Sequence, residues 1–448
     1  MIKKKPANAR ETAAFALFAM AEDGAWSDGA LHHFQSRAGL ADRDAALAAR
    51  LLYGTLQNRR MCDFYLSKYS KVRLSRLAPR VLDILRMAVY QLTMLDRIPA
   101  HAAVAESVNM IRRYCHADER TVGFANGVLR SIARDQQAGK LPRLDCPDKE
   151  SYYALQYSHP EWFVRKLSEQ FGQKEAGRIV QANNTAPPAS VRVNQLKLAA
   201  EAAAVQLAQD GFTVQPHPAM PNILLCSGGE IAAHPLFAEG CITVQDAASA
   251  ACVEVLNPQP GARVIDCCAA PGGKTFYMAE RMGNRGEIIA CDIYEHKLGL
   301  IRAGAERLGL TSIIPRRADG CICQPDLLES ADFVLCDVPC SGLGIIRKKP
   351  EIRFKTDESI AGLPATQSAI LENCSDYVRK GGVLVYSTCT ILQRENEDVI
   401  RDFLAKNPAF KLEAFTHPVC GRTDGCITLL PHLHQTDGFF IAKLRRNA

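Results

Sequence analysis

The chain has 448 residues, and at roughly 100–200 residues per domain this length predicts two to four domains and excludes a single small module. Hydrophobic residues make up 47% and charged residues 23%, a balance that supports sizeable cores and excludes an intrinsically disordered protein. The formal charge of +6 is too small to indicate a nucleic-acid partner by itself. Residues 1–150, however, hold 24 Lys and Arg against 16 Asp and Glu (+8), and the remainder holds 30 against 32 (−2), so the positive surplus lies in the first third.

No apolar segment typical of a secretory signal follows Met1–Lys5. No apolar run reaches the roughly 18 residues that a membrane-spanning helix needs. Its 17 cysteines are an odd number in a chain long enough to build large cores. We therefore expect reduced thiols in a cytoplasmic protein without membrane contact, rather than a disulfide framework.

Residues 6–140 are predicted to be almost entirely helical, because apolar residues such as Val81, Leu85 and Leu92 recur at helical spacing. The breaks between these stretches suit a helical bundle with short connections. Basic residues recur on it at Arg59, Arg60, Lys68, Lys71, Arg73, Arg76, Arg80, Arg112 and Arg113. Solvated helix faces explain any one of them, whereas the cluster between positions 59 and 80 is about as well explained by RNA contact.

Residues 141–240 are predicted to form a linker and a small α/β region. The Gly- and Pro-containing stretch 139–147 is the expected linker. A helix over 159–183 is followed by a strand over 189–194, a helix near 197–209 and a strand over 212–214.

Residues 241–448 alternate between short apolar runs and helical stretches, which is typical of a doubly wound parallel sheet. Strands are predicted at 264–267, 287–291, 312–316, 333–336, 383–386 and 438–444, with helices near 274–282, 296–308, 366–379 and 394–406. Such sheets bind ligands at the carboxyl ends of their strands. The sequence thus predicts a multi-domain fold: a helical bundle over 1–140, the small α/β region, and a Rossmann-like α/β domain.

A tight loop of small residues links the first of these strands to a helix, in the run Asp266-Cys-Cys-Ala-Ala-Pro-Gly-Gly-Lys-Thr275. Its glycines would let a ligand approach the backbone, but it matches neither the phosphate loop nor the dinucleotide fingerprint, and a purely structural loop is an equal alternative. Asp292 ends the next strand, where a carboxylate can accept hydrogen bonds from ribose hydroxyls. Together, the loop and Asp292 favour a nucleoside-containing cofactor.

Two further aspartates and two cysteines follow later strands. Asp319 and Asp337 end successive strands, where an isolated aspartate is more often a turn or cap residue than a site residue. Aligned with Asp292, they can surround one pocket. Cys340 and Cys389 each lie in a loop just past a strand, among polar and turn-forming neighbours that would allow thiolate chemistry.

Most other cysteines are interpreted as small buried hydrophobes, among them Cys267, Cys268 and Cys336. The spacings Cys321-x-Cys323, Cys336-x₃-Cys340 and Cys420-x₅-Cys426 do not make a paired Cys-x₂-Cys zinc set, so we expect no metal.

Nearly the whole chain resembles the ribosomal RNA cytosine-5 methyltransferases of the RsmB (Sun/Fmu) family. The motifs that carry the resemblance are Cys268-Ala-Ala-Pro-Gly-Gly-Lys-Thr275, Asp292, Asp319, Asp337-Val-Pro-Cys-Ser-Gly342, Ser387-Thr-Cys389 and Thr436-Asp-Gly-Phe-Phe440. In the first third, Ile84–Leu92, Arg97–His101 and Gly123–Arg130 are similar to the RNA-binding NusB domain that this family carries at its N-terminus.

The resemblance implies S-adenosylmethionine as methyl donor and one cytosine of 16S ribosomal RNA, free or in early assembly, as substrate of a monomeric enzyme. Its cofactor-binding residues would be Cys268, Ala269, Ala270, Pro271, Gly272, Gly273, Lys274, Asp292 at the ribose, Asp319 near the adenine, and Asp337. Carbon 5 of cytosine is a poor nucleophile, so a thiolate must first add at carbon 6. The family match makes Cys389 that nucleophile, Cys340 the group assisting release, Asp337 a partner of the cytosine edge and Lys274 a residue that lowers a thiol pKa. The target base would have to be unstacked.

The segment Ile345–Arg353 departs from the family pattern, in which a histidine or arginine commonly precedes the proline, so its role at the substrate is open. DNA cytosine-5 methyltransferases are an alternative in which Cys340 would attack, but they are not expected to carry the Ser-Thr-Cys motif or a NusB-like domain. A non-catalytic RNA-binding factor would not need both cysteines and all three aspartates. Transfer RNA is the remaining alternative substrate.

Overall fold

The computed structural model describes residues 4–447, which divide into two compact units. Unit 1 contains the residues up to Asn184 together with Lys349–Lys355, and unit 2 contains Thr185–Lys348 and the residues from Thr356 onward. The division thus falls inside the segment 141–240: its first three helices belong to unit 1, and its strands and later helices belong to unit 2. Among the described residues, no helix is both long and apolar enough to cross a bilayer.

Unit 1 is helical, as the periodicity predicts. Its helices are α1 (Ala9–Asp23), α2 (Ser27–Ala38), α3 (Asp42–Gln57), α4 (Arg59–Tyr69), η1 (Leu74–Arg76), α5 (Pro79–Met94), α6 (Ala100–Tyr114), α7 (Glu119–Gln137), α8 (Lys149–Gln156), α9 (Glu161–Phe171) and α10 (Gln173–Ala182). The side chains of Asn8, Asp118 and Asp148 accept backbone N–H groups at the starts of α1, α7 and α8. The predicted helix over 159–183 is two helices, which are separated at Gly172, where φ is +85°.

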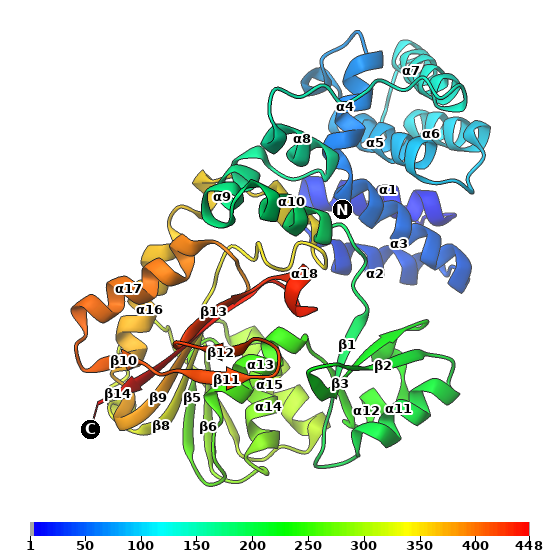
Figure 1. The fold of residues 1–448 in the computed structure, drawn as a ribbon. Helices are drawn as coiled ribbons and strands as arrows, with labels where there is room; N and C mark the ends of the chain where they lie inside the picture. Colours follow the sequence, from blue (N-terminus) through cyan, green and yellow to red (C-terminus); the bar gives the residue numbers. More distant parts are fainter. Residues whose placement is uncertain (1–3, 448) are drawn as a thin grey trace. The chain divides into compact units, whose positions relative to one another are not determined.

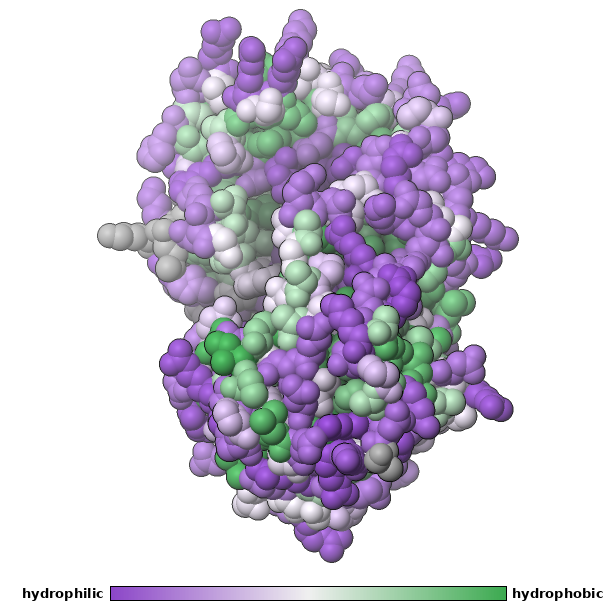
Figure 2. Space-filling model, turned by 90° about the vertical axis from the view of Figure 1, so that its left-hand side faces the viewer, coloured by the Kyte–Doolittle hydropathy of each residue, from purple (hydrophilic) through white to green (hydrophobic). Residues whose placement is uncertain are grey.

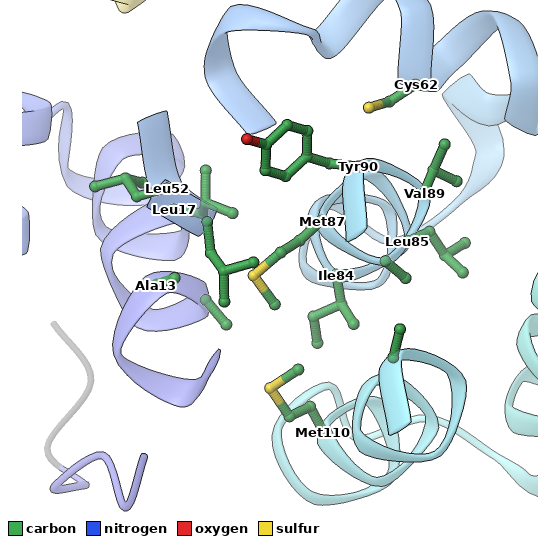
Figure 3. Close-up of a cluster of buried hydrophobic side chains, with 14 of the residues drawn as sticks. Ala13, Leu17, Leu52, Cys62, Ile84, Leu85, Met87, Val89, Tyr90 and Met110 are labelled. Atoms are coloured by element: carbon green, nitrogen blue, oxygen red, sulfur yellow. The ribbon is translucent and has the colours of Figure 1, made fainter. Parts of the chain in front are cut away.

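The core of the bundle forms where α1, α3, α5 and α6 face one another. Figure 3 shows Leu17 of α1 and Met87 of α5 pointing toward each other, with Ile84 above Met110 of α6. All four side chains are 5% exposed or less. Since burial of such a side chain stabilises a fold by roughly 1.5–3 kcal/mol, the apolar faces hold these helices together.

Residues 349–355 complete unit 1 although the chain on both sides of them belongs to unit 2. They contain the short helix η4 (Pro350–Phe354). Arg353 is 3% exposed and donates hydrogen bonds to the Gln57 carbonyl at 2.6 Å and to the Asn184 side-chain oxygen at 3.1 Å. Glu351 accepts hydrogen bonds from the backbone N–H of Ser27 at 3.0 Å and from its hydroxyl at 2.8 Å, at the start of α2. This half of the divergent segment 345–353 therefore has a structural role within unit 1.

Unit 2 begins with a four-stranded antiparallel sheet in the order β2-β3-β1-β4, formed by β1 (Ala189–Val193), β2 (Thr213–His217), β3 (Met220–Ser227) and β4 (Ile242–Val244). It is accompanied by η2 (Ile231–Ala233) and by the helices α11 (Ala200–Gln209) and α12 (Pro235–Ala238). The sequence predicts β1, α11 and the start of β2 but misses β3 and β4.

The larger sheet of unit 2 has eight strands, in the order β10-β14-β9-β8-β5-β6-β7 with β13 paired to β14 (Figure 1). The parallel strands are β5 (Arg263–Asp266), β6 (Glu287–Asp292), β7 (Ile313–Arg317), β8 (Ala331–Asp337) and β9 (Val378–Thr388). The connecting helices are α14 (Gly273–Arg281), α15 (Glu295–Leu308), α16 (Leu363–Ser375) and α17 (Glu397–Lys406), preceded by α13 (Ala247–Leu256). The remaining short elements are η3 (Pro325–Leu327), η5 (Glu358–Ile360), η6 (Gln393–Glu395), α18 (Pro431–His434), β10 (Phe410–Leu412), the β11 (Phe415–His417) and β12 (Gly421–Thr423) hairpin, and β13 (Cys426–Leu429).

The strand order confirms the predicted Rossmann-like domain and locates its binding edge. The order runs outward from β5 to β7 on one side and from β8 to β9 on the other, so β5 and β8 mark the switch point at which such sheets bind ligands. The last strand, β14 (Phe439–Arg446), is antiparallel to β9 rather than a further parallel strand. On the face shown in Figure 2, hydrophilic side chains predominate and the hydrophobic ones form small separate patches.

Candidate active site

The loop after β5 has the geometry of a ligand cradle. It runs from Cys267 to Gly272 and leads into the first turn of α14. Gly272 has φ +112°, and a Cβ there would lie 2.3 Å from the ring of Phe276, so only glycine fits. The backbone N–H groups at the start of α14 lack intrahelical acceptors and can bind a ligand at the switch point.

Asp292 and Asp319 follow the neighbouring parallel strands β6 and β7. Asp292 is 7% exposed and accepts the backbone N–H of Tyr294 at 3.0 Å. Asp319 accepts the backbone N–H of Cys321 at 2.9 Å. Each thus makes the turn contact that an aspartate after a strand commonly makes, at the same edge of the sheet as the cradle.

Asp337 ends β8 and is held between two partners. Lys274, in the first turn of α14, places its ammonium 2.7 Å from Asp337 Oδ2, and the Ser387 hydroxyl donates to Oδ1 at 2.7 Å. Burial would lower the pKa of Lys274, but the negative charge of Asp337 outweighs burial and raises it. The two side chains therefore form a charged pair at the switch point.

Cys340 and Cys389 meet beside this pair, with their sulfur atoms 3.2 Å apart. The hydrogen bond from Cys340 lowers the pKa of Cys389, and the ammonium of Lys274 acts in the same direction, while burial and Asp337 oppose both. The same hydrogen bond, together with burial, raises the pKa of Cys340. These shifts favour the thiolate form at Cys389 and the protonated form at Cys340.

A cavity of about 280 Å³ lies at these groups. Among the residues that the sequence singles out, Cys268, Ala269, Ala270, Pro271, Gly273, Lys274, Asp337 and Cys389 line it. Cys340 adjoins it through its contact with Cys389. Gly272, Asp292 and Asp319 do not line it, so the structure puts the acidic residues after β6 and β7 outside the space next to the thiols.

Asp266 gives an independent sign that this cavity takes a polar ligand. It lines the cavity, accepts a hydrogen bond from the Thr275 hydroxyl at 2.7 Å through Oδ2, and has no hydrogen-bonding partner at Oδ1. Burial raises its pKa to about 7. Buried polar atoms are normally satisfied, so an unpartnered carboxylate oxygen beside a glycine cradle fits the donor groups of S-adenosylmethionine.

An ion cluster that the sequence did not predict contributes Asp246 and Asp437 to the lining of this cavity. Lys348 places its ammonium 2.7 Å from Asp246 Oδ2 and 2.6 Å from Asp437 Oδ2, and Arg347 lies 2.7 Å from Asp437 Oδ1. Despite its burial, Asp246 has a pKa lowered by Lys348, whereas burial raises that of Asp437. The four residues come from three separate segments, so only the Thr436–Phe440 motif gave any signal of the cluster.

Glu395 and Asn396 hold the two cysteine loops. The fully buried Glu395 accepts the backbone N–H of Ser341 at 2.8 Å and the Gln367 amide at 2.9 Å, which fixes the loop of Cys340. Asn396 accepts the Thr388 hydroxyl at 2.6 Å, next to Cys389. Glu395 and Asn396 thus hold the loops that carry the two thiols, and neither residue lines the cavity.

A second link missed by the sequence analysis joins the small sheet to the cofactor cradle. Arg192 on β1 is fully buried, pairs with Glu280 at 2.6 Å and donates to the Gly273 carbonyl at 3.2 Å. Its guanidinium lies 4.6 Å from the ring centroid of Tyr277. The start of α14 is therefore held from the small α/β region.

Three cysteines assemble inside the large sheet in a way that their spacing did not indicate. The sulfur atoms of Cys267, Cys336 and Cys374 all lie within 4.8 Å of one another, and all three residues are buried. They lie in an apolar core with residues such as Ile265 and Leu371. This placement agrees with their interpretation as packing residues.

Comparison with protein-family models identifies three segments. Residues 253–445 match the 16S rRNA methyltransferase RsmB/F model, residues 7–134 match the NusB family, and residues 159–229 match the ferredoxin-like domain of RsmF/B-like methyltransferases. The last range includes both the helices α9 and α10 of unit 1 and the first strands of unit 2.

Relatives match along the entire chain. The probable ribosomal RNA small subunit methyltransferase B of Bacillus subtilis is 34% identical over 99% of both chains. The ribosomal RNA small subunit methyltransferase B of Klebsiella pneumoniae is 34% identical over 99% of this chain and 100% of its own. Among solved structures, PH0851 is 27% identical with a TM-score of 0.82 over 100% of this chain and 99% of its own. A methyltransferase homologue from Pyrococcus horikoshii is 30% identical with a TM-score of 0.59, over 67% of this chain and 100% of its own.

Proposed function

Since the chain belongs to the RsmB/F family of 16S rRNA methyltransferases, we propose that it methylates carbon 5 of one cytosine in 16S ribosomal RNA, with S-adenosylmethionine as donor. The observation that carries the carbon-5 assignment is the pair of thiols 3.2 Å apart beside the Lys274–Asp337 pair. One nucleophile and one proton acceptor are what addition to a cytosine ring and its reversal require.

The reaction begins at Cys389. Its thiolate adds to carbon 6 of the cytosine, a carbon–sulfur bond forms, and the electron pair of the 5,6 double bond becomes available at carbon 5. Lys274 favours the thiolate because its ammonium lowers the Cys389 pKa. Asp337, held by Lys274 and Ser387, is the group to hydrogen-bond the cytosine edge and favour the protonated N3 that accompanies addition.

Release depends on Cys340. When bound, S-adenosylmethionine would supply an electrophilic methyl group to carbon 5 and leave as the neutral thioether, so carbon 5 would carry both a methyl group and a proton. When Cys389 is bound to carbon 6, Cys340 no longer donates a hydrogen bond to a thiolate and loses its proton to water. As thiolate it takes the carbon-5 proton, N3 releases its proton as the 5,6 double bond re-forms, and the carbon–sulfur bond breaks to regenerate the Cys389 thiolate. In the cofactor site, the backbone from Cys268 to Lys274 would hold the donor, with Asp292 at the ribose and Asp319 near the adenine.

The charge distribution supports residues 1–140 as the module that docks RNA, and we propose a monomer acting in the cytoplasm on free or early-assembly RNA. Single-stranded target bases fit an edge cavity of about 280 Å³ better than a base held inside a duplex.

Substitution of the two thiols tests the mechanism. With a 16S rRNA transcript and labelled donor, Cys389→Ala is expected to abolish methylation and any covalent complex, whereas Cys340→Ala accumulates a protein–RNA adduct that migrates slowly on denaturing gels. Cys420→Ala, a half-buried cysteine outside the pair, serves as control. Nucleoside mass spectrometry of the product is expected to show 5-methylcytidine. An adduct in Cys389→Ala instead would reverse the two roles, and methylation at another atom or of transfer RNA alone would refute the proposal.

A further inference from the structure

Unit 1 contains a second cavity, of about 270 Å³, which the reaction does not use. Its apolar walls come from α1, α3 and the segment 349–355, through Leu17, Leu56 and Ile352, all 5% exposed or less. At its mouth Trp26 is 53% exposed and Phe354 is 36% exposed. Its volume lies just below the range of roughly 300–1,000 Å³ that holds drug-sized ligands, so a single ring system is a suitable occupant.

The mouth combines these aromatic rings with cations. The guanidinium of Arg59, the first residue of α4, lies 4.5 Å from the ring centroid of Phe354, and the Lys349 ammonium lies 5.0 Å from that of Trp26. Within residues 4–447, no carboxylate forms an ion pair with Arg59. Burial lowers the pKa of Arg59, while the nearby carboxylates of Asp63 and Asp83 act in the opposite direction. A partly desolvated cation that makes no direct ion pair favours an anionic or electron-rich ligand.

The interior offers a complementary acceptor. Asp83 lines the cavity and binds Arg86 Nη1 at 3.0 Å, while the remaining guanidinium nitrogens of Arg86 pair with Asp63 at 2.7 and 2.9 Å. The Asp83 carboxylate would repel a bare phosphate but can accept hydrogen bonds from an amino group or ring N–H. Donor, acceptor and aromatic faces together match a nucleobase whose phosphate lies near Arg59.

We propose that this cavity binds one unstacked nucleobase of the RNA substrate, with stacking on Trp26, the more exposed of the two rings. The inference rests on the proposed RNA methylation and adds a docking point for that RNA. The NusB match ends at residue 134, whereas Ile352 and Phe354 come from the segment 349–355, so a NusB domain alone lacks four of the fifteen lining residues. Only residues 341–348 separate the segment 349–355 from Cys340. A base bound in the cavity would therefore contact a segment that is close in sequence to the loop of Cys340.

The test uses full-length protein carrying Trp162→Phe, which leaves Trp26 as the single tryptophan. Single-stranded oligoribonucleotides are expected to quench Trp26 fluorescence, and inorganic phosphate is not. Trp26→Ala should weaken binding of a 16S rRNA transcript by about tenfold, since base stacking on an aromatic side chain contributes that much. Arg59→Ala should also weaken it by about tenfold, because it removes a charge-assisted contact to the phosphate. Affinity for S-adenosylmethionine should stay unchanged.

Matched controls separate a base site from general charge. Lys174→Ala removes one exposed positive charge from α10 of unit 1, outside the basic cluster between positions 59 and 80. Tyr152→Ala removes a comparably exposed aromatic side chain of unit 1. Both are expected to change transcript affinity by less than about twofold.

Three results would overturn the proposal: unchanged affinity in Trp26→Ala, equal losses in Arg59→Ala and Lys174→Ala, or competition by inorganic phosphate alone. All titrations are repeated with Cys389→Ala, which cannot form the covalent adduct. If the proposed carbon-5 mechanism is wrong, these titrations still show whether the cavity binds RNA.

Discussion

Replacement of Lys348 by methionine perturbs the buried ion cluster beside the thiols. Loss of the ammonium removes contacts of 2.7 Å to Asp246 and 2.6 Å to Asp437, but Arg347 still pairs with Asp437, so the uncompensated charge is that of Asp246. Breaking one partner of a buried pair costs about 3–5 kcal/mol. Because the Lys348 side chain is 30% exposed and water can partly replace it, we expect a loss of about 2–3 kcal/mol in the free energy of unfolding.

The loss should depend on pH in a definite direction. In the native protein Lys348 lowers the pKa of Asp246, which contributes stability above the unfolded value of about 3.9 that is lost as pH falls. Without the ammonium the folded pKa rises above that value, and stability is then lost as pH rises instead. The deficit of Lys348→Met is therefore small near pH 4 and largest near pH 7.

Urea unfolding followed by circular dichroism measures this deficit. The transition of unit 2 is identified by its shift when S-adenosylmethionine is added, since a ligand stabilises the unit that binds it. Lys380→Met, at an exposed lysine on β9, should stay within about 0.5 kcal/mol of the native chain. Lys348→Met combined with Asp246→Asn should recover much of the loss. A deficit below about 1 kcal/mol that is the same at pH 5 and pH 7 would refute the reasoning.

Three further predictions concern the cradle and the thiols. Lys274→Met should raise the pKa of Cys389 and shift its alkylation by iodoacetamide, followed by mass spectrometry, to higher pH; an unshifted profile would contradict a role of the ammonium. Asp266 has a folded pKa of about 7, above its unfolded value, so it holds a proton that the unfolded chain releases. Unit 2 should therefore lose up to about 4 kcal/mol between pH 4 and 7, and urea midpoints of Asp266→Asn should show a flatter dependence. Gly272→Ala should weaken S-adenosylmethionine binding at least about tenfold in calorimetry because its Cβ would collide with Phe276, and binding equal to that of the native chain would show that the loop can relax.

The features that sequence predicts well are local in the chain. The parallel strands and their helices follow from hydrophobic runs, and the predicted strand 333–336 lies within β8 (Ala331–Asp337). The loop from Cys268 to Lys274 can be recognised by its two adjacent glycines, and at Gly272 a side chain does not fit. Cys340 and Cys389 could be proposed as a pair because each follows a strand of the same sheet.

The features that sequence misses depend on contacts between distant segments. Arg192 and Glu280 are 88 positions apart, and neither carries a local signal of its buried partner. The ion cluster of Lys348 joins three segments, and a lysine in a loop is ordinarily solvated. The antiparallel direction of β14 could not be predicted either, because an apolar run indicates a buried strand but not its direction in the sheet.

The insertion of residues 349–355 into unit 1 has a consequence for the order in which the protein can be made. During synthesis the first 184 residues leave the ribosome long before the segment that supplies Arg353 and Glu351. Translation at about 5–20 residues per second puts roughly ten to thirty seconds between them. For that interval the carbonyl of Gln57 and the amide N–H of Ser27 lack their final partners. The N-terminal unit therefore matures only after most of the catalytic unit has emerged, so it cannot be produced complete as an N-terminal fragment.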